Sequence, residues 1–153
     1  MSLLDSGSPL WTSRMRAIFR IVVGLLFIAH GTQKLFGFPP SPMPGIPVDP
    51  FTQLGVAGII ELIGGSMIVL GLLTRPVAFL LAGEMAVAYF RAHFPRGLFP
   101  INNGGELAVL YCFSFLYLMV TGAGAWSLDA MISRRRHGGL PSDAHRRNID
   151  AAA

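Results

Sequence analysis

Two glutamates, Glu61 and Glu84, lie near the middle of two apolar stretches of the chain. Each stretch is about long enough to cross a bilayer, where a charged side chain costs at least ~2.5 kcal/mol on insertion scales. Such a carboxylate is usually paired, protonated or in use, and it can transfer protons where water is scarce. The two residues therefore predict a membrane protein with a polar interior, and both are candidate catalytic groups.

The spacing of the two glutamates predicts that they lie at one depth. Glu61 is ten residues from Phe51 and Glu84 is ten residues from Phe94. In antiparallel helices this places both carboxylates about 15 Å from the same end. If they face each other, repulsion and desolvation favour a shared proton; if each has a basic or hydroxyl partner, they are structural. Arg91 is expected on the same stripe as Glu84.

A second polar group lies toward the outer ends of the apolar stretches. It contains Glu106, a third catalytic candidate, in the first turn of a helix where the dipole favours an anion. The ligand-binding candidates are His30, Gln33, Lys34, Arg91, His93 and Asn103. A structural interpretation stays open for this group, because lysine and arginine can snorkel to lipid headgroups and Glu106 can complete a helix cap.

The composition agrees with a membrane protein. Of 153 residues, 52% are hydrophobic and 13% are charged, and the mean hydropathy is +0.56. So few charges would solvate a globular surface poorly. The net charge of +4 comes from cations beside apolar segments without interleaved exposed aromatics, so no nucleic-acid partner is expected.

Hydropathy predicts an all-α integral membrane four-helix bundle, with spanning helices at about 15–36, 51–73, 76–94 and 103–125. Residues 73–76 leave room only for a tight hairpin, with Pro76 in the first turn of the next helix. Prolines through 37–50 forbid a regular helix there, and 95–102 forms a shorter loop on the same side. The first helix is too long for a signal-peptide core and is expected to be retained.

Cation placement predicts the orientation of this bundle. Nine arginines fall on the side of the termini and three cations on the other side, which predicts that both termini are cytoplasmic. Residues 1–14 are interpreted as a short polar N-terminal segment, and 15–129 as the membrane domain. Residues 130–153 lack a periodic apolar pattern and are expected to form a basic, loosely ordered cytoplasmic tail.

Several kinds of redox site are not expected. Cys112 is the only cysteine, which excludes intrachain disulfides, CxxC motifs, c-type haem attachment and iron–sulfur clusters. His30 and His93 occur without HxxxH or HExxH spacing. The sequence therefore predicts no metal or haem.

An ordered series of short motifs runs along the chain. Residues 30–37 read HGTQKLFG, 61–65 ELIGG, 70–75 LGLLTR, 103–106 NGGE and 124–129 GAWSLD. From about Arg14 to Asp129 this series resembles the DoxX family of small bacterial membrane proteins. The resemblance implies a four-helix inner-membrane bundle, and its matching polar positions are His30, Gln33, Lys34, Glu61, Asn103 and Glu106. Glu84 depends on the hydropathy argument alone.

Some members of that family are quinone-linked oxidoreductase subunits, including thiosulfate:quinone oxidoreductase, and others belong to redox-stress or catechol and quinone resistance systems. The resemblance thus implies a quinone held near His30 or Lys34, with the glutamates relaying protons. Electrons would come from a partner subunit or a soluble protein, because no cofactor motif is present. The alternative is a non-enzymatic scaffold or assembly factor; a small transporter ranks last, and a homo-oligomer stays open.

Overall fold

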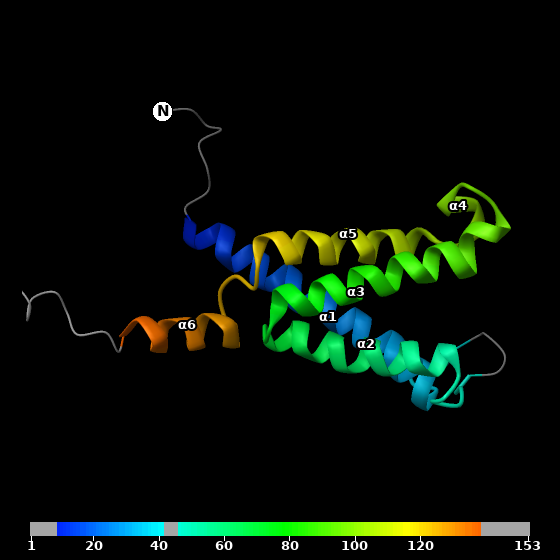
Figure 1. The fold of residues 1–153 in the computed structure, drawn as a ribbon, viewed down its shortest axis with the longest axis horizontal. Helices are drawn as coiled ribbons and strands as arrows, with labels where there is room; N and C mark the ends of the chain where they lie inside the picture. The colour runs from blue at the N-terminus through cyan, green and yellow to red at the C-terminus, as the bar shows by residue number, and fades with distance from the viewer. Residues whose placement is uncertain (1–8, 42–45, 139–153) are drawn as a thin grey trace, which may run out of the picture.

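The computed structural model describes residues 9–41 and 46–138 (Figure 1). Within these ranges the chain is helical and has no β-strand. The elements are α1 (Pro9–Phe36), α2 (Gln53–Leu70), α3 (Thr74–Ala88), a π-helical turn η1 (Tyr89–His93), a 3-10 turn η2 (Phe94–Arg96), α4 (Pro100–Asn103), α5 (Glu106–Thr121) and α6 (Leu128–Gly138).

Three helical segments in the described ranges are long and apolar enough to cross a membrane: α1, α2 and the run Thr74–Arg96. The all-helical membrane architecture is thereby confirmed. Helix α5 has 16 residues, or about 24 Å, against a hydrocarbon core of about 30 Å. It lies between Gly104 (φ 71°) and Gly122 (φ 77°). Positive φ angles favour glycine, and they interrupt the helix at both positions. The fourth span stays a prediction.

Two helix pairs make up the bundle. Helix α1 packs along α2, and α3 packs along α5. The turn Gly71–Leu73 joins α2 to α3, with Pro76 in the first helical turn, so the predicted tight hairpin is confirmed. Gly31 brings the backbones of α1 and α2 into contact: a Cβ there would lie 2.7 Å from the Leu62 nitrogen. In lipid, hydrophobic exclusion does not drive helices together, and close packing of this kind favours their association instead.

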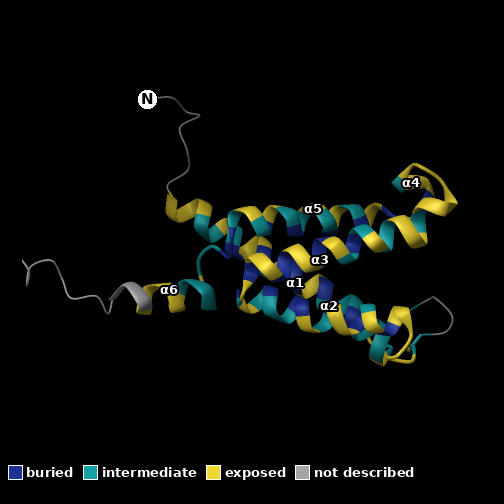
Figure 2. Cartoon of the chain, in the orientation of Figure 1, coloured by how far each residue is buried: buried dark blue, intermediate teal, exposed yellow. Residues whose placement is uncertain are grey.

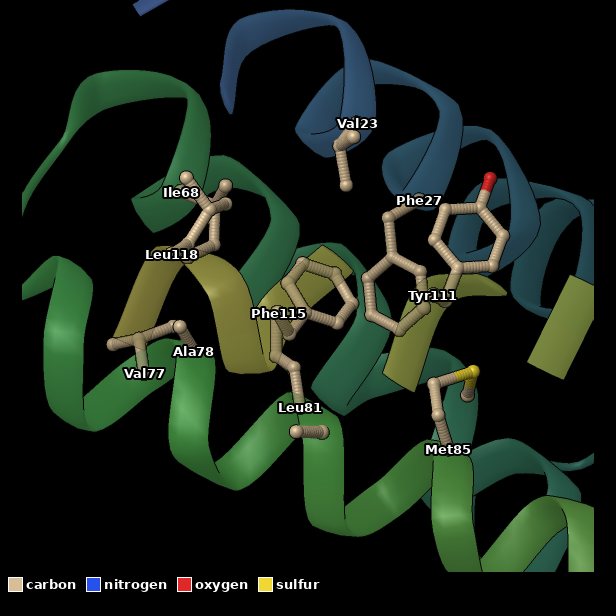
Figure 3. Packing of buried hydrophobic residues seen from close by; sticks show 11 residues of the cluster. Val23, Phe27, Ile68, Val77, Ala78, Leu81, Met85, Tyr111, Phe115 and Leu118 are labelled. Atoms are coloured by element: carbon tan, nitrogen blue, oxygen red, sulfur yellow. The ribbon is translucent and has the colours of Figure 1, made fainter. Parts of the chain in front are cut away.

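The core between the pairs is apolar and partly aromatic (Figure 3). The Phe27 ring of α1 lies 5.1 Å from the ring centroid of Tyr111 and 4.8 Å from that of Phe115, both on α5. Ile68 and Leu81 complete the contact from α2 and α3. Many large apolar residues are exposed on the outside of the helices, as expected of surfaces that face hydrocarbon. Figure 2 shows how exposed positions recur along each helix.

The bundle has two ends, which Figure 1 separates along its long axis. We call them the termini end, where α1 begins and α5 ends, and the loop end, where α1 ends and α4 lies. At the loop end, residues 37–41 and 46–50 are not helical, in agreement with the proline pattern; 42–45 lie outside the described residues. The predicted loop 95–102 instead contains η2 and α4.

A buried arginine holds the termini end together. Arg20 of α1 is 0% exposed. Its Nε donates to the carbonyl of Ala123 and its Nη2 to that of Trp126, both at 2.9 Å. Its Nη1 donates to the carbonyls of Ile68 and Val69 near the end of α2. One guanidinium therefore ties α1 to α2 and to the segment that follows α5.

The segment after α5 is also bound to the α2–α3 turn. The backbone N–H groups of Leu73 and Thr74 donate to the Asp129 carboxylate at 2.8 and 2.9 Å. Asp129 thus caps α3 from a position more than fifty residues away in sequence, and its negative charge lies at the positive end of that helix.

Both predicted terminal boundaries need correction. Helix α1 already begins at Pro9, within the segment 1–14 that was interpreted as polar and separate; proline is well suited to a first helical turn. Helix α6 occupies the start of the predicted loose tail. Helix α6 begins after a capping residue, Ser127, whose hydroxyl accepts from the Ala130 N–H at 3.2 Å. Residues 1–8 and 139–153 lie outside the described residues.

Candidate functional site

The centre of the site is an ion pair between Lys34 of α1 and Glu61 of α2. Glu61 is 2% exposed, and its Oε1 accepts from the Lys34 ammonium. Gly58, one turn before Glu61, makes this contact possible: a Cβ there would lie 3.1 Å from the Lys34 Cβ. The other carboxylate oxygen, Oε2, is buried and has no hydrogen-bond partner among the described residues.

Glu84 of α3 faces the same interior. Both of its carboxyl oxygens are buried, and neither has a hydrogen-bond partner in the described part of the chain. The carboxyl group interacts electrostatically with Glu61 and Lys34. The expectation that the two mid-depth glutamates share one interior is therefore consistent with the geometry. One of them is paired with a cation, and the other is not.

His30 and Tyr111 extend this group toward α5. The His30 ring lies edge-on to the Tyr111 ring, with centroids 5.6 Å apart and planes at 90°. His30 interacts electrostatically with Lys34, and Tyr111 with Glu61. We call the five residues His30, Lys34, Glu61, Glu84 and Tyr111 the central cluster. They come from all four long helices of the described bundle.

The sequence interpretation did not assign Tyr111 to the site. Tyr111, Phe115 and Leu118 follow one another at helical spacing, and all three are buried. That pattern marks the face of α5 that packs inward, and Tyr111 is its polar member. The signal was present, but the position of this face opposite His30 depends on how α5 packs in the bundle.

His93 and Asn103 belong to a separate group at the loop end. The Asn103 side chain is buried; its Nδ2 donates to the Gly97 carbonyl at 2.7 Å and its Oδ1 accepts from the Gly105 N–H at 2.8 Å. His93 Nδ1 lies 3.2 Å from the Asn103 carbonyl oxygen, and its ring stacks on Tyr89. These contacts connect η1, α4 and the start of α5.

The remaining candidates lie outside the central cluster. Gln33 donates to the Pro39 carbonyl at 3.1 Å and so holds the proline-rich loop. Arg91 is exposed on η1, the π-helical turn that follows α3. Glu106 is exposed in the first turn of α5, and no hydrogen bond or ion pair joins it to Glu61 or Glu84 in the described residues.

The residue types of the central cluster suit proton transfer better than metal binding. Among the described residues, no three histidine, cysteine or acidic side chains are grouped as metal ligands would be. The cluster offers an ammonium group, an imidazole and a phenol as hydrogen-bonding groups. It also has two carboxyl groups that can take up or release protons. Hydrogen-bond donors of these types are able to bind the oxygen atoms of a neutral, polar ligand.

The sequence profile of the DoxX family matches residues 15–94. The chain belongs to the DoxX family. Its matched region includes His30, Lys34, Glu61 and Glu84, whereas α5 with Tyr111 follows it. Together with the three apolar helices, this membership makes the chain a multi-pass protein of the bacterial inner membrane. The resemblance found in the sequence motifs is confirmed.

Similar proteins occur in several bacteria. An "Uncharacterized protein" of Haemophilus influenzae is 50% identical over 116 residues, covering 74% of this chain and 87% of the relative. "Inner membrane protein YqjF" of Escherichia coli is 30% identical, covering 77% and 92%. "Putative oxidoreductase CatD" of Bacillus subtilis is 27% identical, covering 80% and 90%. No solved structure matches the chain.

Proposed function

We propose that this DoxX-family protein is a membrane subunit of an oxidoreductase or redox-stress system and that its central cluster binds a quinone. The observation that carries this proposal is Glu84, a carboxyl group buried among helices with no hydrogen-bond partner in the described residues. An unpaired carboxylate at this depth is costly, so a proton on Glu84 stabilises the resting protein. That proton is available to a ligand.

Quinone reduction matches what the cluster can supply. Two electrons and two protons convert a quinone to a quinol, with each carbonyl oxygen becoming a hydroxyl. In this proposal His30 or Lys34 hydrogen-bonds one carbonyl oxygen, and Glu84 and Glu61 relay protons. The electrons come from a second subunit or a soluble redox protein, because the chain has no cofactor motif of its own. The oxidoreductase name of the Bacillus subtilis relative supports this class of function.

A scaffold or assembly factor is the second candidate, and the Lys34–Glu61 ion pair favours it. The pair connects α1 to α2 at a point where their backbones already touch. Buried polar pairs can fix the register of helices without taking part in chemistry. In this case the central cluster would be structural, and a partner protein would dock elsewhere on the bundle.

Ligand-induced stabilisation separates the two candidates. The full-length protein is purified in detergent, and its thermal unfolding is followed while a short-chain ubiquinone or menaquinone analogue is added. A ligand at a hundred times its Kd stabilises by about 2.7 kcal/mol. We expect stabilisation of the wild type and its loss in His30→Ala, Glu61→Gln and Glu84→Gln.

The exposed Arg96 at the loop end provides a control. Arg96→Gln should unfold at the wild-type temperature and keep the full quinone response. If neither analogue stabilises the wild type, the quinone site is refuted. If the glutamate variants instead lower the unfolding temperature and a quinone response persists in them, the cluster is a structural clasp and the scaffold is favoured.

A further inference from the structure

A groove lies between α1 and α5 at the termini end, and its lining contains no residue of the central cluster. Its volume is about 640 Å³, and its lining consists of Trp11, Thr12, Met15, Arg16, Phe19 and Tyr117. The Phe19 and Tyr117 rings meet edge-on, with centroids 5.5 Å apart, where the two helices approach each other. Helices α1 and α5 otherwise have few mutual contacts, which leaves the groove open along their sides.

The lining is amphipathic, with apolar side chains and one fixed cation. Arg16 donates from Nη1 to the Thr121 carbonyl at 2.8 Å, which holds its guanidinium at the end of α5. Arg14 lies one turn from Trp11, with its guanidinium carbon 5.6 Å from the centre of the indole ring. Arg16 therefore lies in the groove lining, Arg14 lies over the ring of the lining residue Trp11, and the lining contains no acidic side chain.

We propose that this α1–α5 groove binds an anionic phospholipid. One acyl chain lies against Met15, Phe19 and Tyr117, and the phosphate group lies at Arg16, where the nearby charge of Arg14 also attracts it. The charge of the region selects this occupant over a second copy of the chain. The described residues at the termini end include seven arginines, Arg14, Arg16, Arg20, Arg75, Arg134, Arg135 and Arg136, against one acidic residue, Asp129. Two such surfaces would repel each other, whereas a lipid phosphate is attracted.

The position of the groove agrees with a lipid occupant. Its apolar residues continue the lipid-facing surface of α1 and α5, on which Ile18, Val22, Leu110 and Phe113 are exposed. Trp11 lies at the end of this surface, where tryptophan is usual at a membrane interface. An acyl chain can thus enter the groove sideways from the bilayer. The proposal does not depend on the quinone site, and either one can fail alone.

Trp11 gives a local reporter, because Trp126 is the only other tryptophan. In a Trp126→Phe background, the full-length protein is placed in vesicles of phosphatidylcholine with increasing phosphatidylglycerol. Bromine atoms on the acyl chains of one lipid or the other quench Trp11 fluorescence on contact. We expect brominated phosphatidylglycerol to quench Trp11 at lower mole fraction than brominated phosphatidylcholine, by roughly fivefold for each arginine that contacts the phosphate.

Arginine variants test the headgroup contact. Arg14→Gln and Arg16→Gln should each reduce the preference for phosphatidylglycerol, while Arg134→Gln, which removes the same charge from exposed α6, should keep it. Arg14→Gln keeps the proposal testable if Arg16→Gln fails to fold, because in the described residues Arg14 contacts the Trp11 ring, whereas Arg16 holds a backbone carbonyl of α5. A preference reduced equally by Arg134→Gln would show only a general surface attraction and would overturn the site.

A tryptophan on a neighbouring lipid-facing surface provides the matched position. Phe79 of α3 is 61% exposed and, like Phe19, lies near the termini end of its helix. With Trp11 and Trp126 both changed to Phe, Phe79→Trp reports ordinary bilayer lipid and should show no preference. Equal quenching by both lipids at Trp11, a preference at position 79 of the same size, or no quenching of Trp11 by either lipid would each refute the proposal.

Discussion

Arg20 shows how a charged side chain can lie inside a membrane protein when backbone carbonyls accept its hydrogen bonds. Its five N–H donors form a planar fork, and the bundle presents four backbone carbonyls to that fork. These carbonyls belong to the end of α2 and to the segment after α5, where the regular helical hydrogen bonds run out. The arginine and the helix end therefore satisfy each other.

Replacing Arg20 should destabilise the fold strongly. Because each hydrogen bond from a charged donor contributes about 1.5–3 kcal/mol, Arg20→Ala should lower the free energy of unfolding by more than about 3 kcal/mol. Arg20→Lys should recover little of this, since one ammonium cannot reach carbonyls on both segments. Thermal unfolding in detergent measures the effect, with Arg134→Ala as the exposed control; an unchanged unfolding temperature in Arg20→Ala would contradict the assigned role.

At the same scale, the sequence could identify the central cluster only in part. Hydropathy was sufficient to mark Glu61 and Glu84 as buried polar groups, because a carboxylate in an apolar membrane helix almost always faces the interior of the bundle. The partner of Glu61 and the contact between His30 and Tyr111 join different helices. Helical periodicity places residues on a face, but it does not say which faces meet. For the same reason the Arg20 contacts could not be predicted.

The helices themselves depend on glycine where they touch. Gly31 is buried in α1, and a Cβ on it would lie 2.7 Å from the nitrogen of Leu62 and 2.8 Å from the carbonyl oxygen of Gly58. Backbone atoms cannot move aside as side chains can. Helices α1 and α2 would have to separate, and the Lys34–Glu61 ion pair lies next to that contact.

A pair of alanine substitutions tests this packing. Gly31→Ala should destabilise the protein by about 1–3 kcal/mol, as overpacking does. Gly83→Ala, in α3, should have the opposite sign and stabilise by roughly 0.5–1 kcal/mol, because nothing lies within 4 Å of the added Cβ. The two unfolding temperatures, measured side by side in one detergent, give the answer. Equal shifts would show that close backbone contact is not what glycine provides at position 31.

The boundaries of the helices depend on single capping residues and glycines, which hydropathy does not detect. Apolar stretches were sufficient to predict α1, α2 and α3, but α1 extends back to Pro9, and Ser127 initiates α6 in a polar segment. The predicted fourth span is shortened by Gly104 and Gly122, whose positive φ values end the helix on both sides. Hydropathy averages over such single residues, whereas caps and glycines decide where hydrogen bonding stops.

At the scale of the whole molecule, the start of α1 and the whole of α6 lie at the same end of the bundle (Figure 1). If α5 crosses the membrane, both termini face the same compartment, and the excess of arginine at that end predicts the cytoplasm. Since α5 is about 24 Å long, crossing requires local thinning of the bilayer or help from its flanking residues.

Thiol labelling in intact cells tests this topology. Cys112 is the only cysteine and is replaced by Ser. Single cysteines are then introduced at Gly97, exposed at the loop end, and at Ser133, exposed in α6. A membrane-impermeant maleimide should label position 97 from outside the inner membrane and position 133 only after lysis. Labelling of both positions from the same side would show that α5 does not cross the membrane.

The contacts that Arg20 and Asp129 make at the termini end have a consequence for biosynthesis. A ribosome delivers α1, α2 and α3 to the membrane before it has made Ala123, Trp126 and Asp129, which complete the contacts of the first helices. Until then the Arg20 guanidinium lacks half of its carbonyls and α3 lacks its cap. A nascent chain that stops at the end of α5 thus contains its apolar helices but lacks the residues that bind Arg20 and cap α3. We expect membrane proteases to degrade such a chain.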